Sequence, residues 1–214
     1  MQSKAVGLLG GTFDPIHEGH LSIAKQVYHA LPLERVDFIP CFQPPHRNQP
    51  DTSANDRLAM VKLAIQDFPY FSANPIEIVS QKISYTIDTL KQLRKENPSQ
   101  AFCFIIGSDA FSQFHKWHDC EKIVELVHLI VVSREHQQLP QSISLQKLLR
   151  DNETKNSNDL HALPAGKIYF QTITPINISA TAIRHALKNH EKKIPGLPKA
   201  VEIYIQEFGL YKSL

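Results

Sequence analysis

Residues 4–20 read KAVGLLGGTFDPIHEGH, a short apolar run that stops at Gly10-Gly11 and continues into a polar turn. An apolar run of this length, ended by glycines, is typical of a buried parallel strand. Beyond the turn, apolar side chains recur at helical spacing at Leu21, Ala24, Val27, Tyr28 and Leu31. Pro32 is expected to end this helix. The stretch therefore predicts a strand, a glycine turn and a helix, the unit from which parallel α/β sheets are built.

The same alternation continues through the chain. Further strands are expected at 35–40, 71–78, 101–106, 127–132 and 167–172. Further helices are expected at 58–68, with Asn55 or Asp56 as the cap, and at 86–96, 179–189 and 199–208. This order predicts an α/β fold, a Rossmann-like doubly wound parallel sheet with helices on both faces.

Length and composition favour one ordinary domain. A chain of 214 residues is expected to form a single domain over 1–214. Residues 134–165 are rich in Gln, Asn and Ser and are expected to be a surface insertion with one short helix at 145–149. A net charge of only +2 argues against a broad nucleic-acid-binding surface.

The cysteines and the apolar runs indicate the cellular compartment in which we expect the protein. The three cysteines are odd in number and widely spaced, as reduced thiols are in cytosolic proteins. The first residues lack the pattern of a signal peptide, and no apolar run is long enough to span a bilayer. We therefore expect a cytoplasmic protein without a membrane partner.

The glycine turn is a candidate anion site. Gly10, Gly11 and Thr12 follow the first predicted strand, at the end where ligands bind in open α/β sheets. Glycines let the backbone approach a phosphate, and a helix start offers free N–H groups. His17 and His20 are expected to share one face of that helix start and to donate hydrogen bonds to oxygens that gain charge in a transition state.

Other interpretations of these residues stay open. Two glycines are also what a tight strand-to-helix turn uses, and His17 with His20 could form half of a metal site, although no third ligand lies nearby in sequence. The segment is neither a P-loop nor a G-x-G-x-x-G fingerprint.

Two motifs at opposite ends of the chain carry a resemblance. GGTFDPIHEGH at 10–20 resembles the H-x-G-H signature of the nucleotidyltransferase superfamily, and ISATAIR at 178–184 resembles its second motif, I-S-x-T-x-I-R. At a helix start, Ser179 and Thr181 offer hydroxyl and N–H groups, and Arg184 adds a positive fork for phosphate. Ser179 could equally be a plain N-cap.

The resemblance implies His17, His20 and Arg184 as catalytic residues. The ATP-binding residues that it implies are Gly10, Gly11, Thr12, Phe13, His17, His20, Gly107, Asp109, Ser133, Arg134, Ser179, Thr181 and Arg184.

Four segments in the middle of the chain, PPHR at 44–47, SYT at 84–86, IGSD at 106–109 and KWH at 116–118, resemble the bacterial nicotinate-nucleotide adenylyltransferases. Those enzymes join nicotinate mononucleotide to ATP and release pyrophosphate. The acceptor-binding residues that the resemblance implies are His46, Arg47, Thr86, Asp109, Trp117 and His118.

The ring and carboxylate of the acceptor are assigned by the same resemblance. Trp117 would stack on the pyridine ring, while Thr86 and the backbone near His118 would hold the carboxylate. Many relatives have tyrosine at the position of His118. From the residues alone, Trp117 could instead be a packing residue.

The expected reaction is direct in-line attack of the acceptor phosphate on the α-phosphorus of ATP. Mg²⁺ is expected to be held mainly through ATP phosphates, without a protein metal site. Another acceptor, such as nicotinamide mononucleotide or phosphopantetheine, and a non-catalytic nucleotide-binding regulator stay as alternatives. The sequence leaves the oligomeric state open, and a homo-oligomer is one option.

Overall fold

A computed structural model describes residues 4–45, 49–133, 142–191 and 193–211. The chain forms two compact units. The first unit comprises Met1–Leu9, Lys25–Asp37 and Tyr85–Thr174, and the second comprises Gly10–Ala24, Phe38–Ser84 and Pro175–Leu214. The assignment of 1–214 to one domain stays a prediction.

Six strands form one sheet. They are β1 (Ala5–Gly11), β2 (Leu33–Pro40), β3 (Phe71–Ala73), β4 (Phe102–Gly107), β5 (His128–Ser133) and β6 (Ile168–Thr172), in the order β3-β2-β1-β4-β5-β6. β1 pairs in parallel with β4, β4 with β5, and β5 with β6. The predicted Rossmann-like α/β fold is thereby confirmed.

The strand order reverses at β1 and β4. The pairing there joins Val6 to Phe102 and Leu8 to Phe104, and all four side chains are buried. In folds of this order, ligands lie beyond the carboxyl ends of the strands at such a switch point. β1 ends at Gly11 and β4 ends at Gly107, both of which the sequence analysis singled out.

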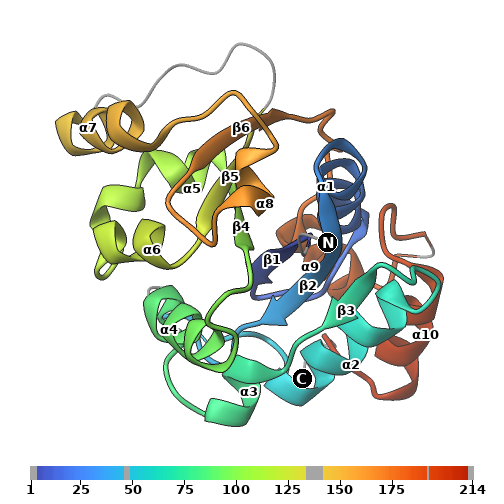
Figure 1. Cartoon of the computed structure of the whole chain (residues 1–214). Helices are drawn as coiled ribbons and strands as arrows, with labels where there is room; N and C mark the ends of the chain where they lie inside the picture. The colour runs from blue at the N-terminus through green and yellow to red at the C-terminus, as the bar shows by residue number, and fades with distance from the viewer. Residues whose placement is uncertain (1–3, 46–48, 134–141, 192, 212–214) are drawn as a thin grey trace. The chain divides into compact units, whose positions relative to one another are not determined.

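The first unit surrounds β4, β5 and β6 with short helices. They are α4 (Thr86–Glu96), α5 (Ser108–Ser112), the 3₁₀ helix η1 (Phe114–Lys116), α6 (Cys120–Leu126), α7 (Ile143–Asn152) and α8 (Asp159–Ala162). α4 packs against α6 (Figure 1).

The described part of the expected insertion holds two helices, α7 and α8, where one short helix was expected. Leu145, Leu149 and Leu160 of these helices are buried, so they contribute to the core of the unit. The buried His128 ring lies at 2.8 Å from the Leu163 carbonyl and accepts from the Lys167 N–H at 3.0 Å.

The second unit contains α2 (Ala54–Ile65), α3 (Ile76–Ser80), α9 (Ala180–Lys188), α10 (Lys199–Glu207) and the start of α1 (Glu18–Ala30). α10, drawn in red in Figure 1, packs against α2, and α2 packs against β3.

Two expectations in this unit were wrong. The strand expected at 71–78 ends at Ala73, and α3 follows with Pro75 at its N-cap, because proline has no N–H to donate to a sheet. The cap of α2 is Ser53, whose side chain accepts from the Asp56 N–H at 3.1 Å, and neither Asn55 nor Asp56 caps the helix.

Among the residues that the structure describes, no helix combines the length and apolar character needed to cross a membrane.

Candidate active site

The turn after β1 is organised around Phe13. This residue adopts a left-handed conformation (φ 50°), and its buried ring meets the ring of His20 edge-on with centroids 5.0 Å apart. A Cβ on Gly11 would lie 2.9 Å from the Phe13 ring, closer than ordinary contact allows. Gly11 therefore makes room for the aromatic ring that supports His20.

His17 and His20 form a stacked pair at the start of α1, with ring centroids 3.7 Å apart. The His17 N–H donates to Nδ1 of His20 at 3.3 Å. Because Nδ1 accepts, the proton of the neutral His20 ring resides on Nε2, which can donate to a ligand. The expected shared face of the two histidines is thus present.

Gly19 lies between the two histidines. A Cβ on Gly19 would lie 2.9 Å from Nδ1 of His17 and 3.6 Å from the Ile178 carbonyl oxygen. The missing side chain therefore accommodates the His17 ring.

Both imidazoles are held in the neutral state. Burial lowers the pKa of His17 to about 4. Burial, followed by the charge of the neighbouring His17, lowers the pKa of His20 to about 3. At neutral pH these side chains can act as hydrogen-bond donors, and positive charge must come from other groups.

We expect the C–H proton signals of the His17 and His20 rings to stay constant between pH 8 and about pH 5, because both pKa values lie well below the ordinary 6.5. The unfolded chain takes up these protons first, so the free energy of unfolding should fall as the pH drops below about 6.5 towards 4. An NMR titration, with His17→Asn and His20→Asn variants to assign the signals, measures this directly. Titration of either ring near pH 6.5 would contradict the expected burial.

The second motif forms the start of α9. The Ser179 hydroxyl accepts from the Ala182 N–H at 3.2 Å, so Ser179 is the N-cap, and Thr181 is exposed in the first turn. Arg184 Nη1 donates to the backbone carbonyl of Asp14 at 2.8 Å, across 170 residues of sequence. The two motifs that the sequence analysis paired are therefore joined by a hydrogen bond.

A second link between the motifs runs through Gly196. Its carbonyl accepts from the Glu18 N–H at 2.8 Å, at the start of α1. A Cβ on Gly196, which has φ 79°, would lie 2.3 Å from Cδ1 of Ile178. Glycine is required here both by the conformation and by the close approach of Ile178.

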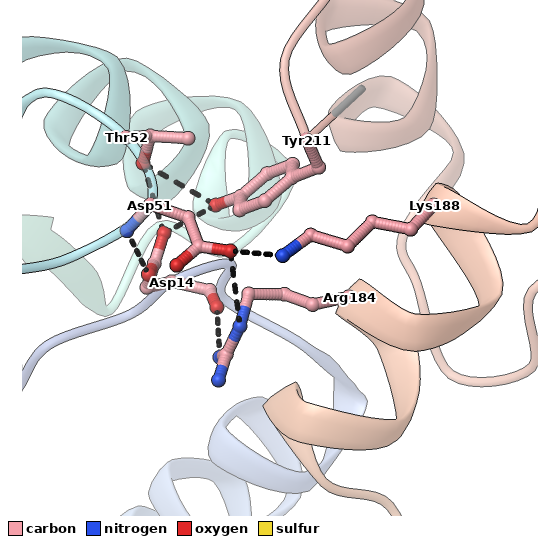
Figure 2. A network of polar contacts seen from close by, with 6 residues as sticks. All are labelled: Asp14, Asp51, Thr52, Arg184, Lys188 and Tyr211. Carbon is pink, nitrogen blue, oxygen red and sulfur yellow. Dashed lines mark hydrogen bonds and ion pairs between the residues drawn. The ribbon is translucent and has the colours of Figure 1, made fainter. Parts of the chain in front are cut away.

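Asp14 is a functional candidate that the sequence analysis missed. Figure 2 shows its buried carboxylate at the centre of a polar network. Oδ1 accepts from the hydroxyls of Thr52 at 2.9 Å and Tyr211 at 2.7 Å. Oδ2 accepts from the Asp51 N–H at 2.8 Å. Asp14 thus ties the first motif to the loop before α2 and to the tail after α10.

Tyr211 is a fixed donor in this network. Burial, together with its hydrogen bond to Asp14, raises the pKa of Tyr211 far above its usual range. The phenol therefore keeps its proton and continues to donate to the carboxylate at any physiological pH.

Asp51 connects the network to two cations (Figure 2). Its Oδ2 lies 3.0 Å from Nζ of Lys188 and 3.7 Å from Nε of Arg184. All three side chains are partly exposed, at 36%, 47% and 26% for Asp51, Lys188 and Arg184.

Arg57 was also missed. Only 1% of this residue is exposed, yet within the described part of the chain it forms no ion pair with a carboxylate. Nη1 donates to the Thr12 carbonyl at 2.7 Å and Nη2 to the Phe42 carbonyl at 3.0 Å. The guanidinium therefore fixes the turn after β1 to the segment after β2. A signal existed in the sequence, because Arg57 is in helical register with the buried Met60, Val61 and Ala64.

The other candidate residues lie in the first unit. Gly107 ends β4 with open space where a Cβ would be, Asp109 is exposed in the first turn of α5, and Ser133 ends β5.

The residues assigned to the pyridine ring lie around η1 and α4. Trp117 is half-buried against Phe104 and Phe114, with ring centroids 6.2 and 5.5 Å away, so the ring has one packed side and some exposed surface. The exposed His118 lies 5.4 Å, between ring centroids, from Tyr85, the residue before Thr86. The structure thus brings His118 and the start of α4 together.

Three predicted residues, His46, Arg47 and Arg134, lie outside the described residues. The first unit also contains a groove of about 340 Å³ between α6 and α7, and none of the predicted site residues lines it.

Comparison with known proteins identifies the family. The model of the cytidylyltransferase-like family matches residues 8–186. A protein of Coxiella burnetii named probable nicotinate-nucleotide adenylyltransferase is 48% identical over 211 residues, covering 97% of this chain and 98% of the relative. A protein of Hydrogenovibrio crunogenus with the same name is 38% identical over 210 residues, covering 98% and 99%.

Solved structures support the fold. The nicotinic acid mononucleotide adenylyltransferase of Plasmodium falciparum, complexed with NaAD, superposes with a TM-score of 0.74 at 21% identity and covers 98% of both chains. The same enzyme complexed with APC gives a TM-score of 0.71 at 20% identity, again over 98% of both chains. With the paired motifs and the near-full-length identity, these findings show that the chain belongs to the cytidylyltransferase-like family and, within it, to the bacterial nicotinate-nucleotide adenylyltransferases.

Proposed function

We propose that this protein transfers the adenylyl group of ATP to nicotinate mononucleotide, which yields deamido-NAD and pyrophosphate. Relatives that share 38–48% of the sequence over almost its full length are named for this activity. The observation that carries the proposal is the hydrogen bond from Arg184 to Asp14, because it places the arginine of one motif beside the turn that leads to His17 and His20 of the other.

In the proposed reaction, a phosphate oxygen of the mononucleotide attacks the α-phosphorus of ATP. The new P–O bond forms as the bond to the β-phosphate oxygen breaks, and pyrophosphate leaves with the electron pair. The attacking oxygen is already ionised at neutral pH, so no general base is needed. Catalysis then consists of positioning two anions and stabilising the charge that builds up between them.

The roles of the residues follow from their states. His20, neutral and with its proton on Nε2, donates a hydrogen bond to a phosphate oxygen, and His17 supports the ring by stacking. Arg184 supplies positive charge, while the free N–H groups and Thr181 at the start of α9 add donors. The turn formed by Gly10, Gly11, Thr12 and Phe13 lets the backbone approach the nucleotide.

We propose that Mg²⁺ takes part as an ion bound through ATP phosphates. Within the described ranges, no three His, Cys, Asp or Glu side chains gather to hold a metal. The ion would take its ligands from phosphate oxygens and water, as Mg²⁺ commonly does with nucleotides, and would supply further charge neutralisation when bound.

On the acceptor side, we propose that Trp117 stacks on the pyridine ring, that Thr86 and the backbone at His118 hold its carboxylate, and that Asp109 accepts from nucleotide hydroxyls. Trp117→Ala is expected to raise the KM for the mononucleotide about tenfold and to change the KM for ATP much less, because stacking on a ring contributes roughly 1–3 kcal/mol. Steady-state kinetics with each substrate varied in turn measures the two constants. An unchanged acceptor KM would show that the ring binds elsewhere.

The function is tested by measuring pyrophosphate release from ATP with each candidate acceptor. We expect rapid release with nicotinate mononucleotide and much slower release with nicotinamide mononucleotide or phosphopantetheine. Mass spectrometry of the products should show deamido-NAD. Release that is faster with another acceptor would reassign the substrate, and a folded protein that releases none with any acceptor would be a nucleotide-binding regulator.

A further inference from the structure

The Asp51 carboxylate faces two cations of α9. Its Oδ2 is 3.0 Å from Lys188 Nζ and 3.7 Å from Arg184 Nε, in the second unit. The two cations are four residues apart on one helix, so their side chains leave from the same face. One carboxylate facing two cations leaves one positive charge uncompensated within this group of three.

Hydrogen bonds from the backbone of Asp51 and from the next residue hold Asp51 in this position. The N–H of Asp51 donates to the buried Asp14 at 2.8 Å, and the next residue, Thr52, donates to the same carboxylate at 2.9 Å. Ser53 then caps α2. These bonds fix the backbone at Asp51, Thr52 and Ser53, and the Asp51 carboxylate lies against α9 (Figure 2).

The contacts themselves are weak enough to be exchanged. Asp51 and Lys188 are 36% and 47% exposed, and the approach to Arg184 is longer than a hydrogen bond. Exposed ion pairs of this kind are worth roughly 0–1 kcal/mol. An oligophosphate carries several charged oxygens and can bind both cations at once, which a single carboxylate oxygen at these distances does poorly.

We propose that Lys188 is a second phosphate-binding cation beside Arg184, and that Asp51 is an internal anion which an oligophosphate must displace. The identity of that oligophosphate as ATP or released pyrophosphate rests on the proposed function. The effect of Asp51 is to weaken the binding of phosphate chains, so it favours the release of pyrophosphate as well as opposing the binding of ATP.

The test is a calorimetric titration of the whole chain with inorganic pyrophosphate and, separately, with ATP. Asp51→Asn keeps the N–H that Asp14 accepts and removes only the charge, so we expect about threefold tighter binding of pyrophosphate. Lys188→Gln should weaken binding about threefold. In the Asp51→Asn/Lys188→Gln double variant, we expect Asp51→Asn to increase pyrophosphate affinity much less than it does in the wild-type background. Both the carboxylate that competes with phosphate and the lysine that it mainly contacts are then absent.

Asp67→Asn is the matched control, because it removes the same charge from an exposed residue for which the structure shows no ion pair with any described residue. We expect its pyrophosphate affinity to equal that of the wild type. Tighter binding of ATP but not of pyrophosphate by Asp51→Asn would overturn the role in binding the phosphate chain. Unchanged or weaker binding of both by Asp51→Asn, an unchanged affinity in Lys188→Gln, or no binding of pyrophosphate by the wild type would each overturn the proposal.

This outcome is separable from that of the proposed function. A wild type that produces deamido-NAD while Asp51→Asn binds pyrophosphate no more tightly would refute only the role of Asp51. A wild type that makes no product, together with the expected shifts in pyrophosphate affinity, would refute only the proposed reaction.

Discussion

His20→Ala is expected to lower the turnover number at least about 100-fold while the protein remains folded, because the loss of one transition-state donor typically costs a factor of 10²–10³. The half-buried ring of His20 packs edge-on against Phe13 and stacks on His17, and its Nδ1 already accepts from the His17 N–H. In the proposed reaction, its Nε2–H is the group that donates to the substrate. Because the pKa of His20 is lowered to about 3, the lost contribution is a hydrogen bond rather than a positive charge.

The measurement is the turnover number at saturating ATP and mononucleotide, with circular dichroism to verify the fold. His29→Ala is the control, since His29 is exposed near the end of the same helix. The turnover of this control should match the wild type. Wild-type turnover in a folded His20→Ala protein would remove His20 from the mechanism.

Arg57→Met is expected to reduce the free energy of unfolding by roughly 2–4 kcal/mol. Methionine fills much of the same space, but the carbonyls of Thr12 and Phe42 lose the donors at 2.7 and 3.0 Å. Each buried acceptor left without a partner costs about 1–3 kcal/mol. Turnover should fall as well, because the Thr12 carbonyl belongs to the turn that carries Phe13.

Urea unfolding monitored by fluorescence measures this change as a shift of the midpoint. Arg57→Lys should recover only part of the stability, because an ammonium lacks the planar fork that reaches both carbonyls. Arg150→Met, on the exposed side of α7, provides the matched control and should change stability by less than about 0.5 kcal/mol. An equally small change in Arg57→Met would mean that water satisfies the two carbonyls.

Much of this fold could be predicted from local patterns. β1, β4, β5 and β6 are short apolar runs, three of them ended by glycine or serine, and α4 was expected over the residues that it occupies, Thr86–Glu96. β1, β4 and β5 bury nearly every side chain, and α4 buries one face at helical spacing, so their sequences are apolar in recognisable patterns. The strand expected at 71–78 ends at Ala73, because Pro75 has no N–H to donate to a sheet and α3 begins directly after it.

The sequence predicted only those residues of the candidate site that belong to a recognisable motif. His17, His20, Ser179 and Arg184 stand in motifs, whereas Asp51, Thr52 and Tyr211 gather around Asp14 only through tertiary structure. No local sequence pattern predicts that the Asp14 carboxylate accepts hydrogen bonds from residues 37, 38 and 197 positions away. Arg57 was hidden because an arginine in an amphipathic helix is usually solvated, although its register with Met60 placed it on the buried face.

The hydrogen bond between Tyr211 and Asp14 also bears on how the protein folds. It closes a loop of 197 residues, and the second unit, like the first, consists of three separate segments of the chain. Closing a long loop lowers the conformational entropy of the chain before the stabilising contacts form. Folds with such long-range contacts therefore fold more slowly. The unit that carries both histidines and Arg184 therefore assembles only when the two ends of the chain meet, and its two motifs come together only then.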